Sequence, residues 1–87
     1  MTSKYTPLAN YLQNAGKSMS EITLTFEKIE EIINDKLPMS ARTYVAWWSN
    51  EASGGTHVQS QAWLSAGWKI KHYNLTREIA TFELIRP

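Results

Sequence analysis

The chain has 87 residues, of which 43% are hydrophobic and 20% are charged, a balance that predicts one small folded domain over residues 1–87 and excludes a disordered segment. It contains no cysteine, which excludes disulfide bonds, zinc–thiolate sites and thiol catalysis within it. The net charge of +1 by itself indicates no polyanionic partner, and the lack of a long apolar run, or of an apolar segment at residues 1–8, favours a cytoplasmic domain without a membrane partner.

The first predicted elements are a helix and a short strand. Thr6 and Pro7 favour a helix start, since threonine is a good N-cap and proline is accepted at the first helical position. Apolar residues at helical spacing extend this helix over about residues 7–15, and Gly16 is expected to end it. Residues 22–24 then favour an extended conformation and predict a single short edge strand.

A second helix is expected over residues 26–34, with Thr25 as its N-cap. Its apolar side chains recur at helical spacing and predict one buried stripe, made of Phe26, Ile29, Ile32 and Ile33. The opposite side carries three carboxylates, which we interpret as a solvated helix face and not as a cation site: Glu27, Glu30 and Glu31.

A third helix is expected over residues 40–48, after a turn at Leu37-Pro38, because the residue before a proline tends to leave helical space. Ser40 is its expected N-cap. The spacing predicts a buried stripe made of Ala41, Tyr44, Val45 and Trp48. Trp47 lies off this stripe, so its side chain is available to stack on a base or contact a protein, or is covered by a further helix.

The next segment is a glycine-containing loop, residues 49–56, followed by a helix over about residues 57–66. Thr56 is the expected N-cap of this helix, and Gly67 is its expected end. Its apolar positions are Val58, Ala62, Trp63 and Ala66.

Two strands complete the chain, over residues 68–75 and 79–85, with a turn at residues 76–78. The order of elements is helix, short strand, three helices and a C-terminal β-hairpin. This order predicts an α+β fold of winged-helix type with three to four short helices, in which the fourth helix is an extra element. It leaves open whether the third or the fourth helix would enter a DNA groove.

The sequence offers no catalytic set. The two histidines, His57 and His72, are far apart, and neither has metal-ligand spacing with another histidine or a carboxylate. No phosphate-binding glycine loop or nucleophile motif is present. We therefore expect a protein that is not an enzyme and that binds no cofactor or metal.

The segment after residue 35 holds more cations than carboxylates, and several of its polar side chains suit DNA. Arginine and asparagine bind guanine and adenine edges, and hydroxyl groups and lysines bind phosphates. The candidate nucleic-acid-binding residues are Arg42, Thr43, Trp47, Ser49, Asn50, Gln59, Lys69 and Lys71. Ordinary exposed surface is the alternative interpretation for these polar residues.

The pattern of the chain over about residues 5–85 resembles a family of small bacterial domains of uncharacterised function. Its most specific parts are Leu24-Thr25-Phe26-x-x-Ile29-Glu30-x-Ile32-Ile33, Leu37-Pro38-x-Ser40-Ala41-Arg42, Trp47-Trp48-Ser49-Asn50 and Gln61-Ala62-Trp63-Leu64-x-Ala66-Gly67-Trp68. Members occur alone or attached to larger proteins, some of them nuclease-like. The resemblance implies an accessory DNA-binding role in bacterial defence or mobile-element systems, and it assigns no catalytic residue.

Two functions follow as hypotheses. The first is a DNA-binding domain of winged-helix type, which rests on the order of elements and on the basic C-terminal half. The second is a protein-interaction module, such as an adaptor, an inhibitor or a homodimer, which rests on the near-neutral charge and the four tryptophans.

Overall fold

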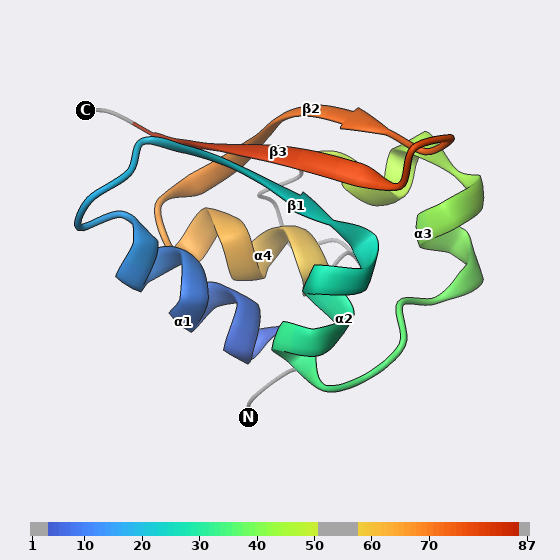
Figure 1. The fold of residues 1–87 in the computed structure, drawn as a ribbon, viewed down its shortest axis with the longest axis horizontal. Helices are drawn as coiled ribbons and strands as arrows, with labels where there is room; N and C mark the ends of the chain where they lie inside the picture. The colour runs from blue at the N-terminus through green and yellow to red at the C-terminus, as the bar shows by residue number, and fades with distance from the viewer. Residues whose placement is uncertain (1–3, 51–57, 86–87) are drawn as a thin grey trace.

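The computed structural model describes residues 4–50 and 58–85, which form a layer of helices against one face of a three-stranded antiparallel sheet (Figure 1). The helices of this layer are α1 (Thr6–Ala15), α2 (Phe26–Ile33) and α4 (Val58–Ser65). The strands are β1 (Glu21–Thr25), β2 (Trp68–Asn74) and β3 (Ile79–Leu84). The short α3 (Met39–Thr43) and the 3-10 helix η1 (Val45–Trp48) lie beside the hairpin turn at one end of the sheet. The predicted α+β class is confirmed.

The strand order in the sheet is β1-β3-β2, so that the C-terminal strand lies in the centre. The predicted short edge strand and the predicted hairpin are therefore both present. Thr23 of β1 pairs with Thr81 of β3, and their hydroxyl oxygens lie 2.8 Å apart. The β2–β3 register shifts by one residue around Lys71, which forms a bulge in β2.

The ends of the first two helices follow the sequence with one correction. The N-cap of α1 is Tyr5, not the expected Thr6, which is already helical. Thr25 caps α2 as expected, since its Oγ1 accepts a hydrogen bond of 2.9 Å from the Lys28 backbone N–H. Asn34 ends α2 in the left-handed conformation, with φ of 55°.

The prediction of one continuous helix over residues 40–48 is wrong. Tyr44 adopts an extended conformation, with φ of −119° and ψ of 123°, and separates α3 from η1. The N-cap of α3 is Pro38, not Ser40. Because of this break, both Trp47 and Trp48 enter the core, whereas the expected core residues Tyr44 and Val45 are 63% and 56% exposed.

The core is an aromatic cluster between the helices and the sheet. Trp48 stacks on Phe26, with ring centroids 4.8 Å apart, and on Trp63, at 6.1 Å. Trp63 in turn meets Phe82 of the central strand edge-on, at 5.7 Å. The Trp48 indole also donates a hydrogen bond of 2.8 Å to the Ala41 carbonyl, which fixes α3 against η1. The cluster thus joins α2, η1, α4 and β3.

The α4 prediction is confirmed at its C-terminal end, where Gly67 has a φ of +85°, a conformation that favours glycine. The expected N-cap, Thr56, lies outside the described residues. In the residues that the structure describes, no helix is long and apolar enough to cross a membrane.

The helix break gives a direct prediction. Replacement of Trp48 by alanine should lower the free energy of unfolding by about 3–5 kcal/mol, because it removes the centre of the aromatic cluster. Tyr44→Ala should change it by less than about 0.5 kcal/mol, because this side chain is exposed. Denaturant unfolding followed by circular dichroism measures both. If Tyr44→Ala lowers the stability as much as Trp48→Ala does, Tyr44 is buried, and the prediction of one continuous helix over residues 40–48 is correct after all.

Candidate nucleic-acid interface

The side chains of Trp47 and Gln59 belong to the interior. Trp47 is 8% exposed, and its ring meets the rings of Tyr5 and Trp48 edge-on, at 5.8 and 4.6 Å. Its carbonyl accepts a hydrogen bond of 3.1 Å from the Gln59 amide, and Gln59 is 5% exposed. Trp47 is therefore covered within the fold, as the second of the two interpretations predicted. The side chains of Trp47 and Gln59 cannot reach a base from this position.

Asn50 holds the start of β2. Its side-chain oxygen accepts hydrogen bonds from the Ile70 backbone N–H, at 2.8 Å, and from the Trp63 indole, at 3.0 Å. Its side-chain nitrogen donates to the Ile70 carbonyl, at 2.9 Å. The amide of Asn50 thus pairs with β2 as a neighbouring strand would, and these contacts occupy the groups with which it would bind adenine.

Arg42 connects α2, α3 and the hairpin turn. Its guanidinium donates to Glu30 Oε2 at 3.1 Å and to Glu78 Oε2 at 2.9 Å, and it lies over the ring of Phe26. Glu30 Oε2 also accepts a hydrogen bond of 2.8 Å from the Leu37 backbone N–H. The Leu37 hydrogen bond, followed by that of Arg42, lowers the pKa of Glu30, and the Glu30 hydrogen bond raises the pKa of Arg42.

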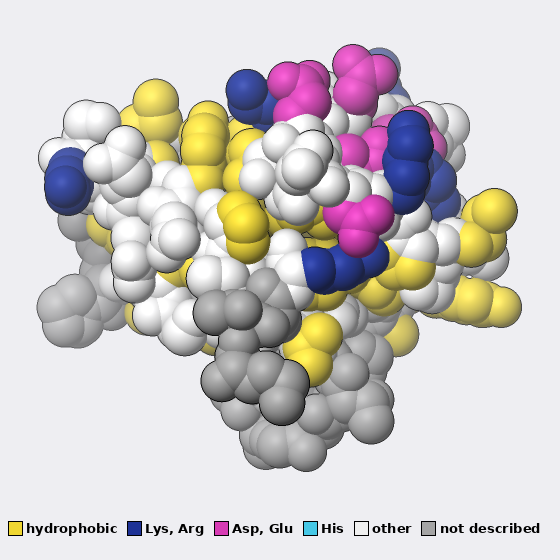
Figure 2. All heavy atoms as spheres, turned by 90° about the horizontal axis from the view of Figure 1, so that it is seen from below, with side chains coloured by type: hydrophobic (Ala, Val, Ile, Leu, Met, Phe, Trp, Pro, Cys, Tyr) yellow, Lys and Arg dark blue, Asp and Glu magenta, His cyan; other side chains and the backbone are white. Residues whose placement is uncertain are grey.

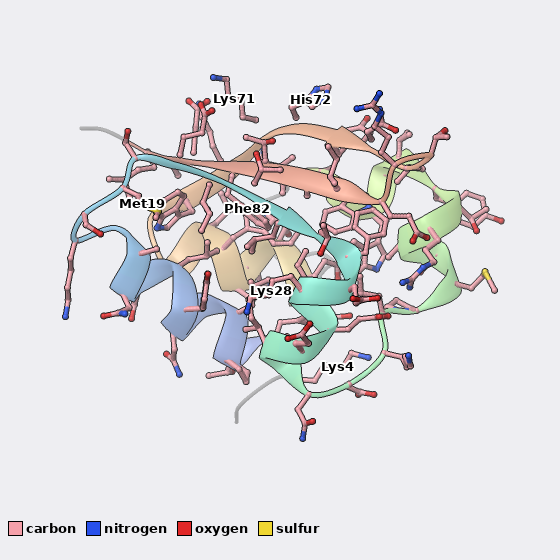
Figure 3. All side chains as sticks on the ribbon, in the orientation of Figure 1. Lys4, Met19, Lys28, Lys71, His72 and Phe82 are labelled. Atoms are coloured by element: carbon pink, nitrogen blue, oxygen red, sulfur yellow. The ribbon has the colours of Figure 1, made fainter. Side chains whose placement is uncertain are left out.

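Lys69 and Lys71 lie on the sheet face that the helices leave uncovered. Figure 3 shows Lys71 pointing away from the helices, whereas Phe82 points toward them. The Lys71 ammonium is 2.7 Å from Glu21 Oε1, and the Lys69 ammonium is 3.8 Å from Glu83 Oε1. This face has an open hollow of about 450 Å³, lined by both lysines and both glutamates, whose formal charges cancel.

The remaining two predicted residues are Thr43 and Ser49. Thr43 is exposed, and its hydroxyl donates to the Met39 carbonyl at 2.9 Å, within α3. Ser49 is half-buried after η1. The structure therefore does not bring the predicted set together, since its members lie in the core, beside the hairpin turn and on the outer face of the sheet.

The structure shows another surface that sequence reasoning did not identify. A groove of about 460 Å³ runs between α1 and α4, and the described residues that line it are Thr6, Ala9, Asn10, Gln13, Val58, Gln61, Ala62 and Ser65. None of them is charged. Seen from the helical side, charged side chains gather mainly in one region, while much of the surface around it is uncharged (Figure 2). The sequence signal for this groove is the pair of amide residues Asn10 and Gln13 on α1, spaced three residues apart and off the positions of its buried leucines.

Chemically, this groove can donate and accept hydrogen bonds, but it holds no group suited to catalysis. Its side chains are amides, hydroxyls and small apolar groups. Within the described ranges there is also no group of three or more histidine or acidic side chains placed to hold a metal ion.

A family model described as a domain of unknown function (DUF7662) matches residues 5–84, nearly the whole chain. The chain belongs to this family. Comparison with curated proteins and with solved structures found no match. Membership in DUF7662 agrees with the resemblance of the sequence to an uncharacterised family, and it carries no activity with it.

The Glu30–Arg42 contact predicts the acid response of this DUF7662 domain. Because the hydrogen bonds from Leu37 and then from Arg42 lower the pKa of Glu30 on folding, these contacts add stability above the ordinary value of 4.5 and lose it as the pH falls through the lower folded value. Glu30→Gln should therefore destabilise the domain at pH 7 and weaken its loss of stability between about pH 5 and pH 3. Thermal unfolding across this range measures the effect.

The matched control is Glu31→Gln, which removes an exposed carboxylate from the same helix. It should leave the stability at pH 7 nearly unchanged. If the two variants show the same stability at every pH, the role given to the Glu30 carboxylate and its contacts with Leu37 and Arg42 is wrong.

Proposed function

We propose that this domain binds duplex DNA as a winged-helix-type module, with α4 as the recognition helix and the β2–β3 hairpin as the wing. The observation that carries the proposal is the topology: a three-stranded sheet of order β1-β3-β2, with α1 before β1 and α4 directly before the hairpin. In helix-turn-helix proteins, the second helix of the pair enters the major groove. The position of α4 before the hairpin is the equivalent place in this chain.

The exposed side of α4 supports this assignment. Val58, Gln61 and Ser65 share one exposed side of α4. The buried residues of this helix are Gln59, Ser60, Ala62 and Trp63. A helix with its side chains is about 10–12 Å in diameter, and the major groove is about 12 Å wide. α4 can therefore present this side to a groove while its other side remains in the core.

The number of lysine and arginine side chains that are free to contact phosphates determines how strongly the domain would bind DNA. Arg42, Lys69 and Lys71 all lie in ion pairs within the domain. Arg77 at the hairpin turn and Lys17 after α1 are exposed, and we assign phosphate contacts to them. About two phosphate contacts give a salt slope of about −2, which is shallow for a DNA-binding domain.

Such a domain alone would bind weakly. When it is linked to a second DNA-binding part, the effective concentration supplies the missing affinity. This suits an accessory module of a bacterial defence or mobile-element system, where the neutral groove supplies selectivity and another part supplies affinity.

Fluorescence anisotropy with a labelled mixed-sequence duplex, from about 50 to 200 mM salt, tests the proposal. We expect duplex binding that weakens with a slope of about −2, and a slope about one unit shallower in Arg77→Ala. Lys71→Glu should bind as the natural chain does, because its side chain lies on the opposite face of the sheet. The absence of binding at 50 mM salt would contradict DNA binding by the domain.

A second candidate, a protein-interaction module, is favoured by a specific observation. Met39 of α3, Tyr44 between α3 and η1, and Val45 of η1 are 77%, 63% and 56% exposed. Clustered apolar side chains on a surface indicate contact with another protein or with a second copy. If the domain binds no DNA but Tyr44→Ser abolishes self-association in sedimentation, this function replaces the first.

A further inference from the structure

We infer that the α4 side of the α1–α4 groove reads base edges and that Gln61 and Val58 there select two adjacent A·T base pairs. This inference rests on the proposed DNA binding and adds its specificity. It is carried by the position of Gln61, by the absence of charge on the described groove residues and by the spacing of the exposed residues of α4.

The two glutamines of α4 have opposite environments. Gln59 is buried, and its amide donates to the Trp47 carbonyl. Gln61, two residues later and so about 200° further around the helix, is exposed and lines the groove. Of these two, only Gln61 therefore presents its amide to a ligand, although the sequence alone favoured Gln59.

The chemistry of the groove suits bases more than phosphates. Strong phosphate binding uses cations, and the described groove residues include none, so the groove can contact phosphates only through neutral hydrogen bonds. The side-chain amide of Gln61 carries a donor and an acceptor next to each other, which match the N7 and N6 groups of adenine. We therefore assign adenine, and not guanine, to Gln61, since guanine is bound most often by arginine or lysine.

Val58 places a second contact beside the first. It is 48% exposed and lies three residues before Gln61, on the same side of α4. Three residues of helix advance by about 4.5 Å, which is enough to reach the neighbouring base pair about 3.4 Å away. An exposed valine there can contact the methyl group of a thymine in the adjacent pair.

α1 supplies contacts of a different kind. Packed helices have axes about 8–10 Å apart, so α1 and α4 together are wider than the major groove. When α4 enters the groove, α1 must lie over its edge. Asn10 and Gln13 are then placed to donate to the sugar–phosphate backbone, which adds affinity without base selectivity.

Selection from a library of duplexes with a randomised core, followed by anisotropy on the selected duplex, tests the inference. The natural domain should enrich two adjacent A·T pairs. Gln61→Ala should lose this enrichment and bind the selected duplex roughly 5- to 100-fold more weakly, with little change on a mixed-sequence duplex. Gln13→Ala should weaken binding to both duplexes by the same factor.

Ser65→Ala, on the same side of α4, is the matched control and should keep the enrichment. Equal melting temperatures for all variants show that the exposed substitutions leave the fold intact. If the domain binds duplexes with the expected salt slope but Gln61→Ala keeps the natural base preference, this inference fails and DNA binding stands. If the natural domain binds no duplex, both fail.

Discussion

The burial of two consecutive tryptophans, Trp47 and Trp48, is the constraint on which the rest of the structure depends. On a regular helix these side chains would point about 100° apart, and only one could face the core. The extended Tyr44 redirects the segment so that each indole has its own neighbours, Trp47 against Tyr5 and Trp48 against Phe26. Each buried tryptophan removes about 150–250 Å² from water, worth at most about 4–6 kcal/mol, which outweighs the few hydrogen bonds that the break removes.

That break has a consequence for the surface. The side chains that a continuous helix would have buried, Tyr44 and Val45, now face water beside Met39. At the same time, the core packing of Trp48 against Trp63 fixes the rotation of α4. Its exposed side is therefore the one that carries Gln61. The packing of the aromatic core thus determines which side of α4 is exposed and can contact a ligand.

Side-chain hydrogen bonds join α3 and the residues after η1 to the rest of the domain. Asn50 holds the residues after η1 against β2, and Arg42 holds α3 against α2 and the hairpin turn. The sequence predicted both residues as DNA contacts, because arginine and asparagine are also the side chains that most often bind base edges. In this domain the same donor geometry is used inside the protein, and it limits the cations available to phosphates.

The sequence predicted those parts of the fold that local signals determine. Thr25 capped its helix, Gly67 ended another, and the alternation after residue 79 gave the central strand. It failed at residues 40–48, where the helical spacing of Tyr44 and Val45 was overridden by the burial of Trp47. The candidate site failed at Gln59 for a different reason: Gln59 was assigned to the surface by its polarity, although it stands three and four residues before Ala62 and Trp63 and so lies on the buried side of α4.

The central claim is that the exposed side of α4 is the DNA-binding surface, and a nuclear magnetic resonance titration with an unlabelled mixed-sequence duplex tests it most directly. The account predicts chemical-shift changes in the side-chain amides of Gln61, Asn10 and Gln13 and at the hairpin turn around Arg77, with unchanged signals from Lys71 and its neighbours on the outer face of the sheet. Changes confined to Tyr44 and Val45, or to the outer face, would contradict it.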